Sequence, residues 1–525
     1  MTKLTREEEI KNLRIQKIQR LKDEAGMEAY PDPATTKPSI SLKDLKENFE
    51  ELEKENQEHK IVGRIMTKRG AGKIAFANIF DGTETFQVVL QTDILGKDKM
   101  KIFDKLFDMG DFANFWGTLF TTQKGEKSLK VSDFKMAGKT LLPLPEKWHG
   151  LKDKEEKYRK RYLDLISDKD TFERFKIRAR IISEIRRILD GEGFLEIETP
   201  VLQNQASGAM AEVFKTHHND YDMDMVLRIA VEAEHKMVMA GGYPGVYEIT
   251  KDFRNEGSDP THMQEFTMLE WYRAYQGQED NIQLTEKILR SIIENVVKKD
   301  KFKIPNGDGE IVEVDFSGEW PRAKFNDLVR EYAKIDPETA SREELEEKAV
   351  ELGGKKEEIK KLSLGNLLDF IYKKSARKNL INPIWVTNYP GSVKPLAIQN
   401  SEGTSETAQL IVAGAEITNN YAELVDPIIQ RKLLEDQVKA KEAGDAEAMD
   451  MNTGFLTAME HGMPPMMGTG IGIDRLVGIF TEQANIRDTV FFPIVKPEQK
   501  ELSKSQLKKL ADKKRREEKE KENLG

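Results

Sequence analysis

The sequence predicts an α+β fold in which a small N-terminal β-barrel precedes a larger antiparallel β-sheet flanked by helices. Two observations predict this arrangement. Between about residues 61 and 139, short β-type runs alternate with turn residues such as Asp81-Gly82 and Lys124-Gly125, a pattern typical of small all-β barrels. From residue 171 onward, amphipathic helical segments alternate with further β-type runs, as in α+β domains.

Composition limits the class of protein. The 525 residues are 38% hydrophobic and 33% charged, which is typical of a globular protein of about three domains. The absence of cysteine excludes disulfides, thiolate catalysis and cysteine-ligated zinc. A net charge of −9 argues against nucleic-acid binding over the whole surface, but leaves a local basic patch open. With no long apolar run and no secretory signal at MTKLTREEEI, we expect a cytoplasmic protein without a membrane span.

Residues 1–55 are predicted to form a helical extension. Thr5 with Glu8, and Ser41 with Asp44, have the spacing of helix N-terminal caps. A proline-containing linker at residues 30–38 separates the two predicted helices. Two interpretations remain open, a solvated appendage and a role in gripping RNA.

Residues 56–145 are predicted to form a five-stranded OB-fold barrel with one helix, Lys97 to Met109, between strands. Barrels of this type bind oligonucleotides. Positively charged side chains can follow the phosphates of single-stranded nucleic acid, and aromatic rings can stack on its bases. The alternative is that the rings belong to the barrel core and the charged side chains form a solvated rim. The residues concerned are Arg64, Lys68, Arg69, Lys73, Phe76 and Phe86.

A basic linker, residues 146–170, is expected to lead into a second domain at residues 171–500. Apolar residues at three- and four-residue steps predict a helix from Thr171 to Leu189. A charged, helical insertion is expected at about 280–380, with Ser341 and Glu344 forming a capping box. The Lys/Glu-rich tail at 501–525 is expected to be disordered or a solvated helix.

Three predicted strands carry polar residues on one face, because side chains alternate along a strand. Carboxylates on a sheet face cost several kcal/mol unless they meet a charge or a hydrogen-bond donor. These faces therefore either contact water or line a polar site for a cation. The three sets are Glu248, Thr250, Asp252 and Arg254; Phe266, Met268, Glu270 and Tyr272; and Asn419, Tyr421 and Glu423.

Glycine alternates at positions 468, 470 and 472, and Arg475 begins a predicted helix. Three such glycines leave one strand face bare, either for a flat ligand or for close packing. The sequence contains no GxxxxGK, no strand–GxGxxG–helix unit and no HExxH pair. These absences exclude a P-loop, a dinucleotide fingerprint and that type of zinc site.

The segment from Phe253 to Glu256, with His262 and the run Glu265–Glu270, resembles motif 2 of the class II aminoacyl-tRNA synthetases. The segment Gly468–Leu476 resembles motif 3, and the helix and strand that end at Pro200 resemble motif 1. The motifs follow the order of the family, within a resemblance that covers about residues 55–500.

Residues 142–151 and 161–165 are similar to the lysyl-tRNA synthetase branch in particular. The resemblance implies an ATP-dependent lysine–tRNA ligase. It would convert L-lysine and ATP to lysyl-adenylate and transfer lysine to the 3′-end of tRNA(Lys). Motif 1 implies a homodimer.

The resemblance also assigns roles to residues. Arg254 and Arg475 would be catalytic and would bind ATP together with Glu256, His262, Phe266, Gly470 and Gly472. The lysine-binding residues would be Gly208, Glu232, Glu270, Tyr272, Asn419, Tyr421 and Glu423. Arg69, Phe76 and Gln87 would read the anticodon, since rings and polar groups recognise unstacked bases in single-stranded RNA.

Mg²⁺ is the implied metal, with Glu416 as its candidate ligand. Gln409 stands where the family usually has a second metal-binding glutamate, so the number of metal ions is left open. Glu416 lies an odd number of residues before Asn419, Tyr421 and Glu423, so a regular strand would place it on the opposite face. A bulge or a strand start must intervene if all four face one site.

Two rival interpretations are a paralogue that attaches a lysine-type amino acid to a protein, and a catalytically inactive RNA-binding protein. Paralogues of the first kind typically lack the barrel. Intact Arg254, Glu256 and Arg475 argue against the second.

Overall fold

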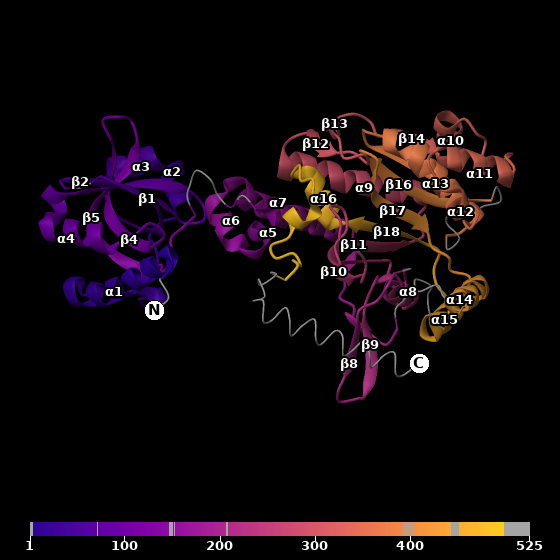
Figure 1. Cartoon of the computed structure of the whole chain (residues 1–525), viewed down its shortest axis with the longest axis horizontal. Helices are drawn as coiled ribbons and strands as arrows, with labels where there is room; N and C mark the ends of the chain where they lie inside the picture. The colour runs from indigo at the N-terminus through magenta and orange to yellow at the C-terminus, as the bar shows by residue number, and fades with distance from the viewer. Residues whose placement is uncertain are drawn as a thin grey trace. The chain divides into compact units, whose positions relative to one another are not determined.

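The computed structural model describes residues 4–70, 72–145, 151, 153–205, 208–209, 211–391, 393, 397–399, 403–442 and 451–497. The chain divides into two compact units, Met1–Lys152 and Asp153–Gly525 (Figure 1). The predicted tail at 501–525, and residues 146–150 of the predicted linker, lie outside the described residues. Within those residues, no helix is both long enough and apolar enough to cross a membrane.

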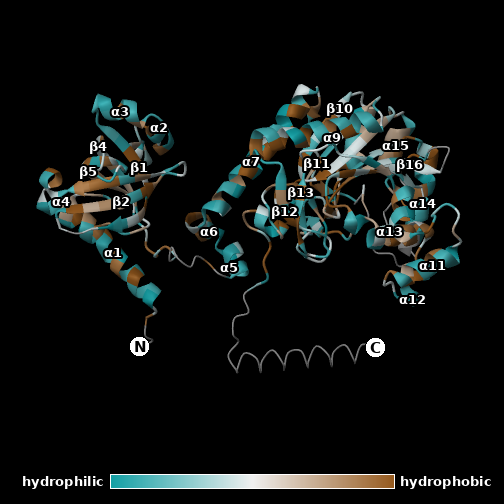
Figure 2. Ribbon diagram, turned by 90° about the horizontal axis from the view of Figure 1, so that it is seen from above, coloured by the Kyte–Doolittle hydropathy of each residue, from teal (hydrophilic) through white to brown (hydrophobic). Residues whose placement is uncertain are grey.

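The first unit begins with helices that pack on a barrel. Thr5 forms the predicted capping box with Glu8, and the Ser41 side chain caps the second helix as predicted. Arg14 anchors the first helix, because its guanidinium donates to the carbonyl of Leu142 at 2.9 Å. Figure 2 shows brown and teal residues alternating along this helix, as expected for a narrow apolar face. The elements are α1 (Arg6–Ala25), η1 (Pro33–Thr36), α2 (Leu42–Glu47) and α3 (Phe49–Glu55).

Five strands close into a barrel in the order β1-β2-β3-β5-β4, which confirms the predicted barrel architecture. Its interior is filled by apolar side chains such as Ile79, Val88 and Phe115, all with no exposed surface. The helix between strands begins five residues earlier than predicted, and Gly96 kinks it with a φ of 78°. The elements are β1 (His59–Arg69), β2 (Ile74–Phe80), β3 (Thr85–Gln91), α4 (Thr92–Leu106), β4 (Phe112–Thr121) and β5 (Lys127–Gly138).

The second unit is built on an eight-stranded sheet in the order β14-β15-β16-β17-β18-β11-β10-β6. All neighbouring strands are antiparallel except the pairs at the two edges, β14–β15 and β10–β6. The predicted antiparallel sheet is thereby confirmed. The strands are β6 (Leu195–Glu196), β10 (Gly245–Phe253), β11 (Glu265–Ala274), β14 (Arg322–Lys324), β15 (Ile384–Pro390), β16 (Thr404–Val412), β17 (Ala415–Ala422) and β18 (Met466–Gly472).

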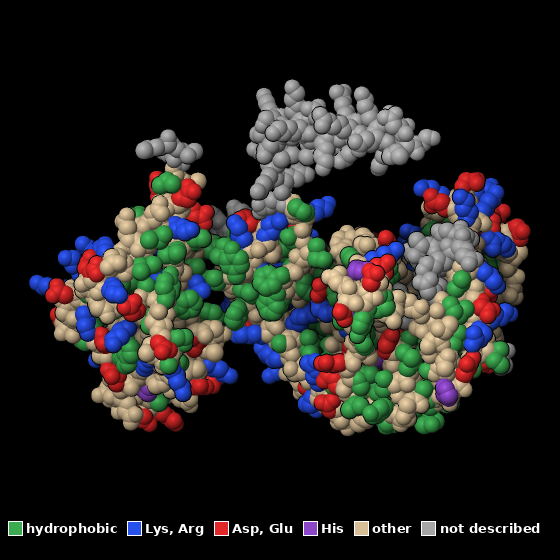
Figure 3. Space-filling model, turned by 90° about the horizontal axis from the view of Figure 1, so that it is seen from below, with side chains coloured by type: hydrophobic (Ala, Val, Ile, Leu, Met, Phe, Trp, Pro, Cys, Tyr) green, Lys and Arg blue, Asp and Glu red, His purple; other side chains and the backbone are tan. Residues whose placement is uncertain are grey.

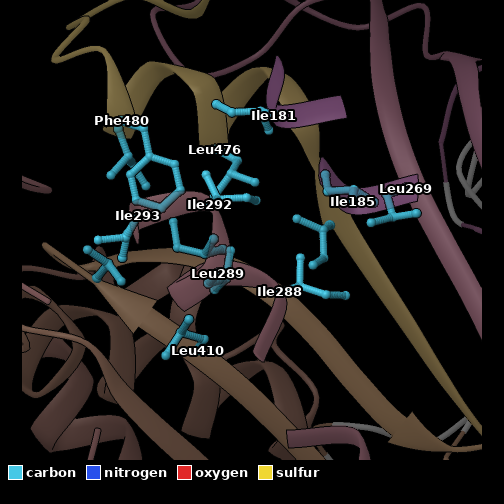
Figure 4. Close-up of a cluster of buried hydrophobic side chains, with 14 of the residues drawn as sticks. Ile181, Ile185, Leu269, Ile288, Leu289, Ile292, Ile293, Leu410, Leu476 and Phe480 are labelled. Atoms are coloured by element: carbon cyan, nitrogen blue, oxygen red, sulfur yellow. The ribbon is translucent and has the colours of Figure 1, made fainter. Parts of the chain in front are cut away.

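One face of this sheet is covered by three helices, α7 (Lys169–Gly191), α9 (Gln278–Ile292) and α16 (Ile473–Phe480). Figure 4 shows side chains from all three helices gathered together with Leu269 of β11 and Leu410 of β16. Burial of each large apolar side chain contributes about 1.5–3 kcal/mol. Because side chains alternate along the strands, this packing leaves the residues between the core positions on the opposite face.

Further helices and strands surround the sheet. The predicted helical insertion also contains three strands, so a purely helical insertion is wrong. In β12, Lys301-Phe302-Lys303-Ile304 alternates charged and apolar residues with the period of a strand. On the face shown in Figure 3, acidic and basic side chains are intermixed over each unit. The helices are α5 (Lys154–Arg159), α6 (Arg161–Ser167), α8 (Glu232–Ala240), the π-helix η2 (Ile293–Val297), α10 (Phe325–Ala333), α11 (Arg342–Glu351), α12 (Lys356–Ile359), α13 (Leu364–Ser375), η3 (Arg377–Asn379), α14 (Pro427–Glu442), α15 (Thr453–Glu460) and η4 (Ile486–Thr489). The remaining strands are β7 (Leu202–Gln203), β8 (Lys215–His218), β9 (Met223–Leu227), β12 (Lys301–Pro305) and β13 (Ile311–Asp315).

Candidate active site

A cavity of about 380 Å³ lies against the sheet face opposite the core helices. It brings together every site residue predicted in the second unit except Gln409. The residues that line it include Gly208, Glu232, Arg254, Glu256, His262, Phe266, Glu270, Tyr272, Glu416, Asn419, Tyr421, Glu423, Gly470, Gly472 and Arg475.

The β10–β11 hairpin forms part of this cavity, and its pairing sets the side-chain faces. Phe266 pairs with Asp252, and Glu270 pairs with Glu248. Phe266, Met268, Glu270 and Tyr272 all line the cavity, so the predicted common face of β11 is confirmed.

The polar face of β10 is buried except at Arg254, which is half-buried. Glu248 and Asp252 are buried around Arg228, whose Nη1 lies 3.0 Å from Glu248 Oε1 and whose Nε lies 3.5 Å from Asp252 Oδ1. Burial raises the pKa of Asp252 to about 6, although Arg228 opposes the shift. A buried arginine therefore supplies the cation that this face needs, and of its four polar residues only Arg254 lines the cavity described above.

Two arginines lie at different parts of the cavity. The Arg254 guanidinium lies over the Phe266 ring, 5.2 Å from its centroid, and its contacts with the Ile229 carbonyl are long, at 3.4 Å. Arg475 Nη1 donates to the carbonyl of Glu416 at 2.6 Å, which fixes the side chain. Burial lowers the pKa of Arg475, and Glu416 opposes this shift. The arrangement provides one loosely held cation and one anchored cation for an anionic ligand.

At the tip of the hairpin, Glu256 and His262 are exposed. His262 Nδ1 lies 2.8 Å from Asp259 Oδ2, which orients the imidazole ring. Both predicted residues therefore lie at the open side of the cavity.

The deeper end of the cavity is acidic. Glu232, Glu270 and Glu423 line it, and Tyr421 and Tyr272 donate to Glu232 and Glu270, each at 3.1 Å. Burial, with the charges of Asp252 and Glu232, raises the pKa of Glu270 well above its usual range. Burial likewise raises the pKa of Glu423 to about 8, although Lys236 opposes it. Such a pocket favours a ligand that carries positive charge.

Sequence reasoning missed Lys236, which is buried beside these carboxylates. Its Nζ lies 2.6 Å from Glu232 Oε1 and also contacts Glu423 Oε2. Burial alone would lower the pKa of Lys236, but Glu232 and Glu423 outweigh burial and raise it. Three carboxyl groups surround this one ammonium, so acidic groups remain in excess in the pocket. The Glu232–Lys236 spacing of four residues on a helix was the signal that could have revealed the pair.

Two glycines are required by the shape of this acidic end. A Cβ at Gly468 would lie 2.7 Å from Tyr272 Cε1 and closer still to Glu423 Oε1. Gly208 has a φ of +81°, and a Cβ there would lie 3.0 Å from Glu232 Cβ. The bare face predicted for β18 therefore leaves room for Glu423 and Tyr272 as well as for a ligand.

The three sequence motifs are tied together beneath the cavity. Arg178 of α7 lies 2.6 Å from Asp474 Oδ1 and donates to Thr267 Oγ1 at 2.9 Å. The amide of Thr267 in turn donates to Asp474 Oδ2 at 2.7 Å. This network links α7, β11 and α16, and so fixes Arg475 relative to the hairpin.

Glu416 and Gln409 occupy neighbouring strands but differ in their surroundings. The pairing of β16 with β17 shifts between Leu410 and Ile411, so that Ile411 is opposite Glu416. The expected bulge is therefore confirmed, and Glu416 lines the same cavity as Asn419. Gln409 lines a second, smaller cavity, which Glu416 also lines.

In the barrel, the three residues predicted to read an anticodon lie on adjacent strands. Arg69 is paired with Phe76, with its guanidinium 6.0 Å from the ring centroid. Phe76 is half-buried, and Gln87 of β3 accepts a hydrogen bond from Ser128 Oγ at 3.0 Å. Cation and ring are thus adjacent on β1 and β2, and Gln87 lies on the next strand.

Two other residues of the predicted nucleic-acid patch are corrected by the structure. Phe86 is 4% exposed and belongs to the barrel core. Lys68 Nζ turns inward and donates to the carbonyls of Phe103, Asp104 and Phe107. Burial lowers the pKa of Lys68 to about 8. The alternation of side chains along β1 could not show that the long Lys68 side chain reaches the end of a helix.

Comparison with known proteins agrees with this geometry. A family model for tRNA synthetases class II (D, K and N) matches residues 153–496, and one for an OB-fold nucleic acid binding domain matches residues 59–137. The lysine–tRNA ligase of Clostridium tetani is 41% identical over 461 residues, or 86% of this chain and 90% of the relative. That of Lactococcus lactis subsp. cremoris (strain MG1363) is 41% identical over 496 residues, 92% and 98% of the two chains. That of Clostridium acetobutylicum is 40% identical over 505 residues, 94% and 96% of the two chains. With the motifs assembled around one cavity, this chain belongs to the class II tRNA synthetases of the D, K and N group.

Proposed function

We propose that this enzyme is a lysine–tRNA ligase, which activates L-lysine with ATP and transfers it to the 3′-end of tRNA(Lys). The observation that carries the proposal is the acidic end of the cavity, next to the two arginines. Its three carboxyl groups outnumber the one ammonium of Lys236, so once ionised they can hold the ammonium groups of lysine. The carboxylate of an aspartate side chain would instead be repelled there.

The first step joins a lysine carboxylate oxygen to the α-phosphorus of ATP, and the bond to the bridging oxygen breaks as pyrophosphate leaves. The attacking carboxylate is already ionised, so the step needs no general base. Catalysis then consists of positioning and of stabilising phosphate charge. Arg254 is placed for the α-phosphate and Arg475 for the far end of the triphosphate. Arginine suits both positions because its planar fork binds two phosphate oxygens.

The residues present fit Mg²⁺ through Glu416. Mg²⁺ is commonly held by one or two carboxylates, with substrate phosphates and water as its other ligands. Among the described residues, no cluster of three or more acidic or histidine side chains could hold a metal by itself. When bound, Mg²⁺ would neutralise phosphate charge, and Glu416 would anchor it to β17.

We further propose that two chains associate through the segment that contains α7. Leu195, Val201 and Leu202 follow this helix and are 44%, 36% and 46% exposed. Exposed apolar side chains in one segment are typical of a protein interface. The proposed place of action is the cytoplasm, where tRNA is charged.

The test of the proposed function is ATP–pyrophosphate exchange with each of the twenty standard amino acids in turn. We expect exchange with lysine and, with lysine present, charging of tRNA(Lys). Exchange that depends on any other amino acid, or no exchange at all, would refute the assignment. Exchange with lysine but transfer to a protein would identify the paralogue instead.

The pH dependence of lysine use should follow Glu423. Its carboxylate must be ionised to bind an ammonium, and burial raises its pKa to about 8. The group is therefore protonated at low pH, and kcat/KM for lysine should rise with pH up to about 8 and then level off. In Glu423→Gln, kcat/KM should be low and nearly independent of pH. An unchanged rise in that variant would assign the titration to another group.

Replacing Phe76 by alanine should separate the two reactions. Without the ring, the barrel loses a base-stacking surface worth about 1–3 kcal/mol, so charging of tRNA should weaken by about tenfold or more. Lysine-dependent pyrophosphate exchange should be unchanged. Phe120→Ala is the control, since Phe120 is a half-buried ring on β4 of the same barrel. Equal effects of the two substitutions on charging would remove Phe76 from anticodon binding.

A further inference from the structure

A second cavity, of about 120 Å³, adjoins the active site. Glu416 lines both cavities, so the small one lies beside the residue proposed to hold Mg²⁺. Nearly all its lining is polar. The charged and hydrogen-bonding residues that matter here are Asp369, Lys373, Arg377, Tyr389, Gln409 and Glu416.

Gln409 is a weaker metal ligand in this cavity than a glutamate would be. Its Oε1 accepts a hydrogen bond from the Tyr389 hydroxyl at 2.6 Å, and its Nε2 donates to Asn419 Oδ1 at 3.1 Å. One of the two lone pairs of Oε1 is thus already used, and the amide carries no charge to offset that of a divalent ion. The residues on this side of Glu416 therefore fit a second divalent ion less well.

Arg377 supplies a positive charge at the same place. Within the described part of the chain, its guanidinium makes no hydrogen bond and no ion pair, although it is only half-exposed. The neighbouring cation, Lys373, is paired with Asp369 at 2.5 Å. Arg377 thus faces the cavity with its charge unpaired.

Arg377 and Arg475 repel each other across this region. Burial lowers the pKa of Arg475, and the positive charge of Arg377 lowers it further. The Glu416 carboxylate lines both cavities and opposes the pKa shift of Arg475, but one carboxylate against two arginines leaves one positive charge in excess, as expected where an anion binds. Partially buried cations of one sign cost free energy in the empty site, which a bound polyphosphate would recover.

We propose that Arg377 binds the polyphosphate end of ATP and the pyrophosphate released from it, on the Gln409 side of Glu416. This inference rests on the proposed function. Arg377 would supply the positive charge that a second metal ion would otherwise provide. It forms no covalent bond, and its contribution is a charge-assisted hydrogen bond to phosphate oxygens.

The test measures binding of three nucleotides by calorimetry in the presence of Mg²⁺. The probes are AMP, ADP and the non-hydrolysable triphosphate analogue AMP-PNP. In Arg377→Met, we expect AMP-PNP to bind about tenfold more weakly, the loss of one charge-assisted hydrogen bond, while AMP binding is unchanged. Arg377→Lys should recover part of the affinity. Unchanged lysine binding to Arg377→Met checks that the variant is folded.

The matched control is Lys373→Met, which removes a paired cation from the same cavity. Binding of free pyrophosphate is measured in parallel. If Arg377→Met weakens the binding of AMP-PNP but not that of pyrophosphate, the part of the proposal that concerns released pyrophosphate is refuted. Equal losses for AMP and AMP-PNP, or equal effects of the two substitutions, would overturn the inference. If the unsubstituted enzyme binds none of the nucleotides, the proposed function fails and the inference falls with it. If that enzyme binds AMP-PNP and Arg377→Met binds it equally well, the inference alone fails.

Discussion

Replacement of Arg254 by alanine is expected to lower kcat/KM for lysine-dependent pyrophosphate exchange by about 10²–10³-fold, the usual cost of removing one donor that stabilises transition-state charge. The guanidinium lies inside the cavity, against Phe266, and its backbone contacts are long at 3.4 Å. Under the proposed function, it would meet charge that develops on the α-phosphate. Because that charge grows in the transition state, kcat should fall by more than KM rises.

The control for this prediction is Arg322→Ala. Arg322 is partly exposed and is paired with Glu279 at 2.6 Å, outside the cavity. The Arg322→Ala substitution should leave lysine-dependent pyrophosphate exchange unchanged. A loss of less than about fivefold in Arg254→Ala would place the stabilising donor elsewhere.

Replacement of Lys236 by methionine is expected to destabilise the enzyme by about 3–5 kcal/mol. It should also weaken lysine binding, because Lys236 opposes the burial that raises the pKa of Glu423 and so helps to keep that carboxylate ionised. Removing one partner of a buried ion pair leaves the others uncompensated, which is the source of that cost. Here Glu232 and Glu423 would both lose the ammonium that they share. The free energy of unfolding, from denaturant titration, measures the first effect, and lysine affinity from calorimetry measures the second.

Two further variants identify the origin of the effect. Lys160→Met removes a lysine with the same four-residue spacing from a glutamate, Glu156, but at a solvent-accessible position, and should cost less than about 1 kcal/mol. The double variant Lys236→Met/Glu423→Gln removes one uncompensated charge and should regain about 0.5–3 kcal/mol of stability. It should not regain lysine binding. Additive losses in the double variant would show that Lys236 and Glu423 are not coupled.

Much of the fold and of the active-site cavity could be predicted because periodicity is a local property. Strand parity placed Phe266, Glu270 and Tyr272 on one face, and the structure confirms that face. The capping boxes at Thr5 and Ser341 marked helix starts correctly, since both residues that form each box are only three positions apart.

What could not be predicted depends on contacts between segments that are distant in the sequence. Arg228 covers the polar face of β10 from outside the strand. The alternation of residues along a strand cannot predict a partner from another segment. Lys68 looked like a surface cation, but its long side chain reaches carbonyls of α4. The strands β12 and β13 were missed because charged residues on their exposed face resemble those of a solvated helix.

The three alternating glycines of β18 differ in how much space their neighbours leave, and this difference implies a gradient of tolerance to mutation along a single strand. At Gly468 even a methyl group meets Tyr272 and Glu423; at Gly470 the nearest atom is the mobile Met268 Cε at 3.2 Å; at Gly472 it is Arg475 Cβ at 3.8 Å. Alanine should therefore be excluded at the proposed lysine end and accepted towards the proposed ATP end. Evolutionary change along β18 would then alter nucleotide binding far more readily than the choice of amino acid.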